Sequence, residues 1–319
     1  MKEALEEFGT VLENEELSKH TTYKVGGTAL YLFRPTSVEN LVSSLKYLQA
    51  NKIKYFILGN GSNVIFKGEY YNGVVIKLDL LNNYEIDEEN LILTAEAGVY
   101  LPKLSSVLAK KGYSVFEWAS GLPGSVGGSI YGNAEAYKVP ISDSLIDVTV
   151  FKDGKIKIIK KEDISFAYRT SQFKEDDNSV ILSARFKFEK KDANEIIDLI
   201  KDRAIRRMNS QPLDYPSAGS VFRNPKAKDY QELVEKYNIP YNESGFISAG
   251  YLIEQCGLKG TKIGGAIVSE KHANFILNVD NATSNDIIDL INLVYVKVKM
   301  KFEIDLILEQ EIVDLAKEE

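Results

Sequence analysis

A glycine-dense segment near the middle of the chain places the strongest constraint on the fold. Residues 118–134 carry no charge and contain five glycines and a proline, so they cannot form a membrane-spanning helix. A second glycine segment, residues 59–63, follows an apolar strand pattern at residues 55–58. Glycine lets successive backbone N–H groups approach a pyrophosphate closely, so the pair favours a nucleotide cradle. Each segment alone also fits a tight connection in a β-rich domain.

The standard phosphate and nucleophile signatures are absent from the sequence. It contains no G-x-S-x-G and no G-x-x-x-x-G-K-[ST]. The glycine segment that starts at Gly59 begins like the dinucleotide motif G-x-G-x-x-G, but Val64 stands where the third glycine belongs. A strand pattern rather than a helix follows it. A hydrolase elbow and a Rossmann domain are therefore not supported.

Composition excludes further kinds of chemistry. The 319 residues include 39 Lys or Arg and 46 Asp or Glu, and the net charge of −7 argues against a general binder of nucleic acid or anionic membranes. With Cys256, His20 and His272 as its only cysteine and histidines, the chain cannot form an intrachain disulfide or a multi-histidine metal site. Cys256 and His272 could form a thiol–imidazole pair, but the apolar pattern around Cys256 favours a small core residue. We expect no metal, and the charged N-terminus predicts a cytoplasmic protein.

Helix and strand patterns alternate along the chain, which predicts a mixed α+β protein. Asp153-Gly154 lies between two β patterns and predicts a hairpin. A helix is expected over residues 194–208, and the proline-bearing break at 211–216 marks a domain boundary. Near the end, residues 302–308 alternate between apolar and polar side chains, which predicts a final strand that returns to an earlier domain.

A series of longer motifs runs along nearly the whole chain. They are residues 22–27, 58–63, 121–128, 168–171, 216–225, 249–254, 271–275 and 308–312. In this order they resemble the UDP-N-acetylenolpyruvoylglucosamine reductases, which are flavoenzymes of peptidoglycan precursor synthesis. The Pro-Ser-Ala-Gly-Ser form of residues 216–220 is similar to the shorter of the family's two types. Several motifs in one order are far more specific than any one of them.

The resemblance implies an α+β fold with an FAD-binding domain of the vanillyl-alcohol-oxidase (PCMH) type in two subdomains, plus a separate α+β substrate-binding domain. The FAD-binding subdomains are expected over residues 1–79 and over residues 80–208 with 301–319, and the substrate-binding domain over 209–300. FAD would be bound without a covalent link, and NADPH would be the reductant. The protein would act as a monomer on a small-molecule UDP-sugar, without a nucleic-acid or membrane partner.

The resemblance also implies the reaction. NADPH passes hydride to FAD N5, and the reduced flavin then reduces the enolpyruvyl double bond of UDP-N-acetylglucosamine enolpyruvate, giving UDP-N-acetylmuramate. Hydride delivery builds negative charge next to a carboxylate, so the site needs a carboxylate clamp and a proton donor. By resemblance Arg169 is the clamp, Ser220 is the proton donor, and Glu311 is a second acid or a carboxylate orienter. Taken alone, Arg169 and Glu311 would be solvated side chains and Ser220 a turn serine.

Binding residues follow from the same resemblance. FAD is expected to contact Gly59, Asn60, Gly61, Ser62, Asn63, Gly121, Gly124, Ser125 and Gly127. The substrate is expected to contact Tyr168, Arg169, Asn224, Lys259 and His272. Residues 206–271 contain nine Lys or Arg against seven Asp or Glu in an otherwise acidic chain, which suits a diphosphate. The chain departs from the family pattern at Asn60, Gly132 and Glu135, and none of these is a proposed catalytic group.

Two other functions stay open. An oxidase of the same fold would act on an alcohol or hydroxy acid and would often attach FAD through His or Cys, of which the chain has only three. A nucleotide-sugar-binding module without catalysis would lack Arg169, Ser220 or Glu311, and all three are present.

Overall fold

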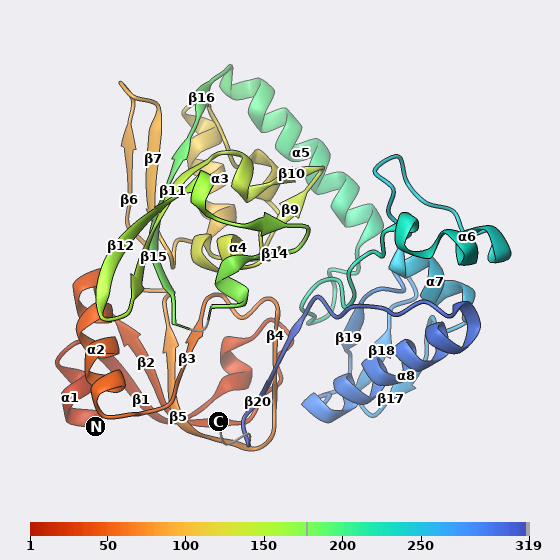
Figure 1. The fold of residues 1–319 in the computed structure, drawn as a ribbon, viewed down its shortest axis with the longest axis horizontal. Helices are drawn as coiled ribbons and strands as arrows, with labels where there is room; N and C mark the ends of the chain where they lie inside the picture. The colour runs from red at the N-terminus through yellow and green to blue at the C-terminus, as the bar shows by residue number, and fades with distance from the viewer. Residues whose placement is uncertain (177, 317–319) are drawn as a thin grey trace. The chain divides into compact units, whose positions relative to one another are not determined.

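The computed structural model describes residues 1–176 and 178–316. Contacts between Cα atoms divide the chain into two compact units. Unit 1 comprises Met1–Glu15, Ala29–Asn60 and Asn72–Arg207, and unit 2 comprises Glu16–Thr28, Gly61–Tyr71 and the chain from Met208 onward. Figure 1 labels the helices and strands of both units. Each unit therefore combines segments that are distant in the sequence.

The first sheet of unit 1 has four strands in the order β1-β2-β5-β3. Its strands are β1 (Gly9–Glu16), β2 (Thr28–Pro35), β5 (Tyr70–Lys77) and β3 (Tyr55–Leu58). The helices nearest in sequence are α1 (Lys2–Glu6) and α2 (Val38–Ala50), and five residues of α2 are buried. The last residue of β3, Leu58, pairs in parallel with Lys77. The glycine segment that begins at Gly59 therefore leaves the end of a parallel strand.

The second sheet of unit 1 is antiparallel, with the strand order β12-β11-β15-β7-β6 (Figure 1). Its strands are β6 (Tyr84–Asp87), β7 (Ile92–Glu96), β11 (Leu145–Lys152), β12 (Lys155–Lys160) and β15 (Val180–Lys187). The predicted hairpin is confirmed, because Lys152 pairs with Lys155 across Asp153 and Gly154, whose φ angles are +53° and +74°. Positive φ at both turn residues is the geometry that Asp-Gly favours.

Among the described residues of unit 1, three further α-helices and three short strand pairs follow. The helices are α3 (Leu101–Lys110), α4 (Val126–Tyr131) and α5 (Ala193–Ser210), whose last residues belong to unit 2. The pairs are β8 (Tyr113–Ser114) with β16 (Glu189–Lys190), β9 (Glu135–Ala136) with β10 (Val139–Pro140), and β13 (Phe166–Ala167) with β14 (Thr170–Ser171). The helix predicted over 194–208 is confirmed as α5. Helix α4 packs on β7 and β15, so the glycine-dense segment is held directly on the antiparallel sheet.

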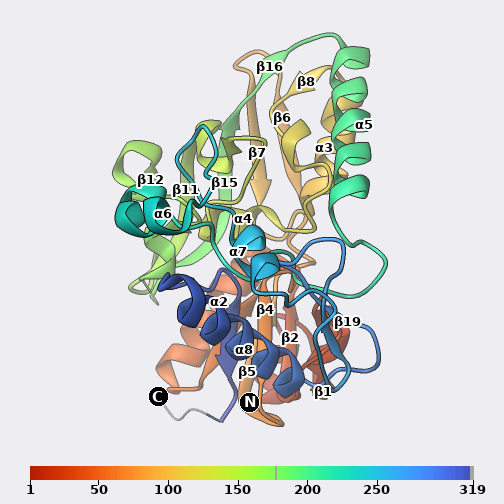
Figure 2. The same cartoon turned by 90° about the vertical axis from the view of Figure 1, so that its right-hand side faces the viewer.

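The described part of unit 2 contains a three-stranded antiparallel sheet, a parallel strand pair and three α-helices. The strands are β17 (Lys262–Ile263), β18 (Ala266–Val268), β19 (Ile276–Asn278), β4 (Val64–Lys67) and β20 (Glu311–Asp314). The helices are α6 (Gln231–Tyr237), α7 (Ala249–Gln255) and α8 (Ser284–Phe302). Helix α8 begins at a capping box formed by Thr283 and Asp286, and it packs on β17, β18, β19 and β4 (Figure 2). The α+β fold class is confirmed in both units.

The prediction of a β-strand over residues 302–308 is wrong, because these residues form no hydrogen-bonded ladder with another strand. Helix α8 continues to Phe302, and in residues 303–308 only Leu308 forms an isolated bridge, to Phe222. The alternation is nevertheless real, because Phe302, Ile304 and Leu306 are buried in the core of unit 2. Alternation reports which side chains are buried and does not identify a hydrogen-bonding partner.

Contacts between Cα atoms group residues 301–316 with residues 209–300 in unit 2. The predicted assignment of residues 301–319 to the FAD-binding subdomain of residues 80–208 stays a prediction. The separation of residues 1–79 from 80–208 stays a prediction. In the described part of the chain, no helix is both long and apolar enough to cross a membrane.

Candidate functional site

The two glycine segments meet inside unit 1. The side-chain amide of Asn60 donates to the carbonyl oxygen of Pro123 at 2.7 Å. A Cβ on Gly59 would lie only 2.7 Å from Ser125 Oγ, and that hydroxyl accepts a hydrogen bond from Gly128 N at the start of α4. Gly59, Asn60 and Ser125 therefore lie together, and a side chain at position 59 would displace the Ser125 hydroxyl. Their contact with FAD stays a prediction.

The remainder of the first segment belongs to unit 2 and is held by its carbonyl groups. Gly61 O accepts from Thr22 N at 3.0 Å, and Asn63 O accepts from Glu311 N at 2.8 Å. Gly61 has a φ of +64°, and a Cβ there would overlap the carbonyl oxygen of His20. The backbone N–H groups of residues 59–62 donate to none of the described residues. Anchored carbonyls and available N–H groups suit an anionic ligand.

Close packing explains the glycines of the second segment. A Cβ on Gly127 would lie 2.8 Å from Ala97 Cβ, and a Cβ on Gly124 would lie 3.0 Å from Ser129 Oγ. The Ser129 hydroxyl is buried and has no hydrogen-bond partner among the described residues. Together with the N–H groups of Gly59 and Asn60 in the same unit, this unused hydroxyl gives a donor set that fits the diphosphate of FAD.

The sequence interpretation missed Arg207 in this region. A Cβ on Gly121 would lie 2.9 Å from Arg207 Cδ, so the arginine covers the glycine segment directly. Burial lowers the pKa of Arg207, and no described carboxylate forms an ion pair with it. A partly buried cation beside the segment fits an electron-rich ligand, because an unpaired buried charge is costly.

Tyr168 and Arg169 form the two-residue turn between β13 and β14 in unit 1. Arg169 has a φ of +58°, and its guanidinium carbon lies 6.0 Å from the centre of the Tyr168 ring. The hairpin is fixed beside α4, because Asn133 Nδ2 donates to Ala167 O and Ser171 Oγ donates to Tyr131 O. A non-glycine residue at positive φ is strained, so the fold holds this turn in place.

Ser220 lies in unit 2 on an irregular segment that is anchored on its C-terminal side. Buried Asn274 binds both polar groups of Phe222, accepting from its N–H at 3.0 Å and donating to its carbonyl at 2.8 Å. Val221 N donates to Asn274 O, and Glu309 N donates to Val221 O. The Ser220 hydroxyl makes no hydrogen bond to a described residue. It is therefore available to a ligand.

Glu311 begins β20, which pairs in parallel with β4 and places Glu311 opposite Val64. The preceding residue, Gln310, is buried, and its Nε2 donates to the carbonyl oxygens of Ala218 and Gly219 at 3.2 Å each. The residues next to Ser220 and next to Glu311 are thus hydrogen-bonded directly. Unit 2 brings two of the three predicted catalytic residues into one neighbourhood, and Arg169 belongs to unit 1.

The predicted substrate residues of unit 2 gather around α7. Asn224 Oδ1 accepts from Ala249 N at 2.9 Å, and Lys259 Nζ forms an ion pair with Glu254 at 2.7 Å. The His272 ring lies against Gly250, where a Cβ would stand 3.3 Å from His272 Cε1. Burial lowers the pKa of His272, and nearby Lys259 lowers it further. Its Nδ1 accepts from Asn274 N, so His272 is also linked to the residue that anchors the Ser220 segment.

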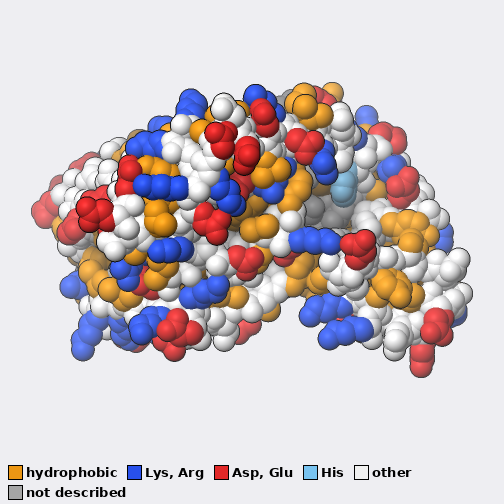
Figure 3. Space-filling model, turned by 90° about the horizontal axis from the view of Figure 1, so that it is seen from above, with side chains coloured by type: hydrophobic (Ala, Val, Ile, Leu, Met, Phe, Trp, Pro, Cys, Tyr) orange, Lys and Arg blue, Asp and Glu red, His pale blue; other side chains and the backbone are white. Residues whose placement is uncertain are grey.

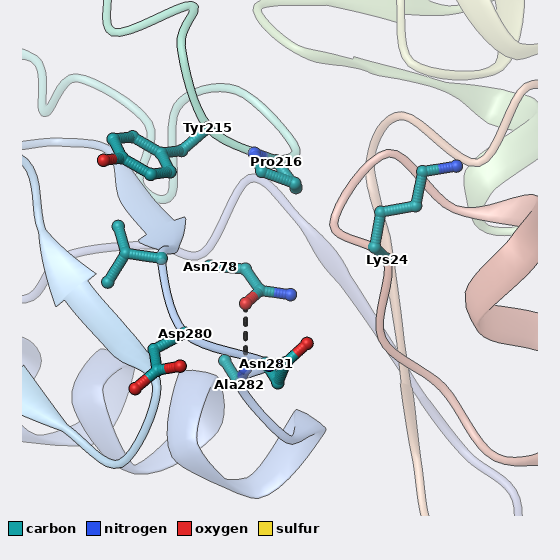
Figure 4. Close-up of a pocket in the computed structure, with 8 residues that line it drawn as sticks. Lys24, Tyr215, Pro216, Asn278, Asp280, Asn281 and Ala282 are labelled. Carbon is teal, nitrogen blue, oxygen red and sulfur yellow. Dashed lines mark hydrogen bonds between the residues drawn. The ribbon is translucent and has the colours of Figure 1, made fainter.

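A polar cavity of about 450 Å³ in unit 2 contains none of the predicted site residues. Lys24 and Tyr215 are among the residues that line it, and Asn278 Oδ1 accepts from Ala282 N at 2.8 Å (Figure 4). Asn278 also donates to the carbonyl oxygen of Tyr23. Asn278 therefore connects the lining of this cavity to Tyr23.

The surface carries charged side chains of both signs. Lys and Arg side chains are interspersed with Asp and Glu over the face in Figure 3. No group of three or more His, Cys, Asp or Glu side chains in the described residues could hold a metal ion. Cys256 is half-buried, burial raises the pKa of its thiol, and its Sγ lies 3.7 Å from Lys297 O. These contacts support the core interpretation of Cys256.

Two protein-family models match the chain. An FAD binding domain matches residues 29–159, and the UDP-N-acetylenolpyruvoylglucosamine reductase C-terminal domain matches residues 211–313. The first match contains the residues that meet at Gly59 and Ser125. The second contains Ser220, Glu311 and the residues gathered around α7.

Relatives match over nearly the full length. The UDP-N-acetylenolpyruvoylglucosamine reductase of Carboxydothermus hydrogenoformans is 40% identical over 303 residues, covering 95% of this chain and 93% of the relative. The reductase of Bacillus subtilis is 38% identical over 309 residues, covering 96% and 95%. The crystal structure of UDP-N-acetylenolpyruvylglucosamine reductase from Thermus caldophilus matches with a TM-score of 0.77 at 30% identity, covering 96% of this chain and 100% of that chain.

Proposed function

Because the chain belongs to the UDP-N-acetylenolpyruvoylglucosamine reductase family, we propose that it reduces the enolpyruvyl double bond of UDP-N-acetylglucosamine enolpyruvate to UDP-N-acetylmuramate. The reaction belongs to peptidoglycan precursor synthesis. The structural observation that carries the proposal is the Ser220 hydroxyl, which has no partner among the described residues although its backbone is anchored. Such a hydroxyl suits a role toward a ligand better than a role in the fold.

Bound FAD would carry the hydride from NADPH to the substrate. We assign its diphosphate to the glycine segments of unit 1, since the N–H groups of Gly59 and Asn60 and the Ser129 hydroxyl are unused within the described chain. Asn60 ties the two segments together through Pro123, and Arg207 adds a cation beside Gly121. The chain therefore supplies hydrogen-bond donors and one positive charge to a ligand that carries two phosphates.

Three side chains are proposed to stabilise and neutralise the negative charge that develops on the substrate. Arg169 would bind the carboxylate in a bidentate manner, because a guanidinium stays charged and presents a planar pair of donors. Ser220 would donate a proton to the carbon next to that carboxylate, and Glu311 would act as a second acid or orient the carboxylate. A serine is a weak acid, so the hydroxyl must be held in position before the proton moves.

The substrate's diphosphate would be bound by the residues around α7. Lys259 is paired with Glu254, so we propose that it exchanges this carboxylate for a phosphate. The amide nitrogen of Asn224 makes no hydrogen bond to a described residue, and His272 presents a ring kept neutral by burial. Tyr168, next to Arg169, would contact the substrate from the β13–β14 turn. We further propose a cytoplasmic monomer that acts on a soluble UDP-sugar.

The rival proposal is an FAD oxidase with a covalently attached flavin. The three side chains that could form the link are His20, His272 and Cys256. Cys256 packs near α8, and His272 is packed against Gly250, which argues against both as attachment points. Acid denaturation decides, because a non-covalent flavin leaves with the supernatant, whereas a covalent one stays with the precipitate.

The test separates the two half-reactions. Purified protein is expected to be yellow and to oxidise NADPH, and stopped-flow absorbance follows flavin reduction by NADPH and reoxidation by UDP-N-acetylglucosamine enolpyruvate. Ser220→Ala should leave reduction near the wild-type rate and slow reoxidation by at least about 100-fold. Ser217→Ala, in the same segment, is the matched control. A colourless protein without affinity for FAD would overturn the proposal, and equal slowing of both half-reactions would overturn the role of Ser220.

A further inference from the structure

We propose that Gln310 is a positioning residue that orients Ser220 for proton donation. This inference rests on the proposed function and adds a residue to it. Gln310 is 3% exposed, and its side-chain amide is hydrogen-bonded at both ends. Nε2 donates to the carbonyl oxygens of Ala218 and Gly219, and Oε1 accepts from the hydroxyl of Tyr23 at 3.2 Å. A single buried side chain thus bridges the two residues before Ser220 to a buried tyrosine.

Tyr23 determines which way the Gln310 amide faces. Tyr23 is fully buried, and burial raises the pKa of its hydroxyl, so the group stays protonated and acts as a donor. Gln310 Oε1 must therefore face Tyr23, which directs both N–H bonds of the amide toward the carbonyl oxygens. Tyr23 is itself anchored, because Asn278 Nδ2 donates to its carbonyl oxygen at 3.0 Å. The orientation of Gln310 follows from its partners.

The two sides of Ser220 are held in different ways. On the C-terminal side, Val221 and Phe222 bind Asn274, and Val221 O also accepts from Glu309 N. On the N-terminal side, the hydrogen bonds that the carbonyl groups of Ala218 and Gly219 accept from described residues all come from Gln310. Gly219 has a φ of +77°, and a Cβ there would meet nothing within 4 Å. Glycine is therefore needed at position 219 because of its positive φ, and not because a neighbouring atom leaves no room for a side chain. Since no packing contact at position 219 restrains this turn, the hydrogen bonds from Gln310 hold it in place.

Loss of this bridge should therefore act mainly on the Ser220 half of the reaction. A displacement of about 1 Å of a reacting group can cost about 100-fold in rate. Gln310→Leu keeps the volume and removes all three hydrogen bonds. We expect flavin reoxidation by the substrate to slow by about 100-fold, whereas flavin reduction by NADPH and the FAD absorption spectrum stay as in the wild type.

Gln310→Glu adds a second readout, the pH dependence of flavin reoxidation, which a simple loss of stability would not produce. An ionised carboxylate would face two carbonyl oxygens, whereas a protonated carboxyl could donate to one of them. Tyr23 donates to this position, and Glu309 and Glu311 flank it along the chain, so burial and like charges both raise the pKa of the introduced group. The reoxidation rate of the variant relative to wild type should rise about tenfold from pH 8 to pH 6. Taking the ratio removes the titration of groups that both proteins share.

Two controls make the outcome decisive. Gln231→Glu makes the same change at an exposed position on α6, and its ratio to wild type should not change with pH. A flat pH ratio for folded Gln310→Glu, or equal slowing of both half-reactions in Gln310→Leu, overturns the inference. If Gln310→Leu does not fold, the pH ratio of Gln310→Glu alone decides. A wild-type protein that NADPH reduces but the substrate does not reoxidise would instead overturn the proposed function.

Discussion

The glycine segments of unit 1 and the Ser220 segment of unit 2 are held by opposite means. In unit 1 the chain approaches itself where side chains are missing, as where Gly59 meets Ser125 and Gly127 meets Ala97. In unit 2, buried side-chain amides bridge backbone segments through hydrogen bonds. Asn274 binds Phe222 in this way, and Gln310 binds Ala218 and Gly219. We therefore expect the glycine segments of unit 1 to be destabilised by added side-chain atoms. The Ser220 segment of unit 2 should instead be destabilised by the removal of side-chain atoms.

This difference matches what each region is proposed to bind. A diphosphate needs backbone N–H groups at short range, and any Cβ in the way blocks the approach. A proton donor needs one hydroxyl at a fixed position, and buried amides fix a backbone in both of its hydrogen-bonding directions. The following predictions test the contrast with substitutions that add atoms in unit 1 and remove them in unit 2.

The largest loss of stability is expected for Asn274→Ala. The substitution leaves the buried N–H and carbonyl of Phe222 without partners, at about 1–3 kcal/mol for each group, so unfolding should become easier by about 3 kcal/mol. Urea unfolding measures it as a lower midpoint with an unchanged slope. Asn82→Ala, which removes an exposed hydrogen bond to Asp79 O, is the control and should shift the midpoint little. Equal midpoints would show that Asn274 does not hold the Ser220 segment.

Adding one methyl group tests unit 1. A Cβ on Gly127 would lie 2.8 Å from Ala97 Cβ, so Gly127→Ala should destabilise unit 1 by about 2 kcal/mol. Gly132→Ala adds the same atom where the nearest described atom outside the local backbone is 3.6 Å away and φ is −90°, so it should be neutral or stabilise by up to about 1 kcal/mol. Similar unfolding midpoints for the two variants would contradict the close-packing account.

The same contrast explains what sequence reasoning could reach. Where only glycine fits, the requirement is visible in the sequence as the glycine itself. The segments 59–63 and 121–127 could therefore be selected from their residue types alone. The Asp153-Gly154 hairpin was found because its signal is local. Ser220, Arg169 and Glu311 were identified only through resemblance to a family, since a serine, an arginine or a glutamate carries no local signature of catalysis.

Gln310 and Asn274 could not be found from the sequence. Gln310 binds residues 91 and 92 positions away, and Asn274 binds a residue 52 positions away. Neither residue belongs to a periodic or local sequence pattern that would predict a hydrogen bond to so distant a residue. Alternation at residues 302–308 likewise predicted burial correctly but said nothing about the partner, which is why the expected final strand was wrong.

A smaller effect is expected where the two glycine segments meet. Gly59→Ala would push Ser125 Oγ away and disturb its bond to Gly128 N, so FAD affinity should fall about tenfold, equivalent to about 1.4 kcal/mol. The double variant Gly59→Ala/Ser125→Ala should recover part of this loss, because the added methyl group then has space. Fluorescence titration of the apoprotein with FAD measures both. Strictly additive losses would show that the two positions do not contact each other.

The smallest effect is expected from the titration of His272. Burial lowers its pKa, so the unfolded chain takes up a proton at a higher pH than the folded chain does. The stability that a neutral His272 gives is present above the ordinary histidine pKa of about 6.5 and is lost as the pH falls toward the lower folded value. His272→Gln should therefore lose less stability than wild type between pH 7.5 and pH 5.5. Urea midpoints at the two pH values measure the difference, with Phe275→Leu as the control.

Phe275 contacts the His272 ring at 4.9 Å between centroids but does not titrate. Phe275→Leu should lower the midpoint by the same amount at both pH values, because it removes packing without changing proton uptake. If His272→Gln kept the wild-type pH dependence, the neutral ring would not be what links α7 to Asn274. The support of the Ser220 segment would then depend on the amides alone, and the contrast with the glycine segments would become sharper.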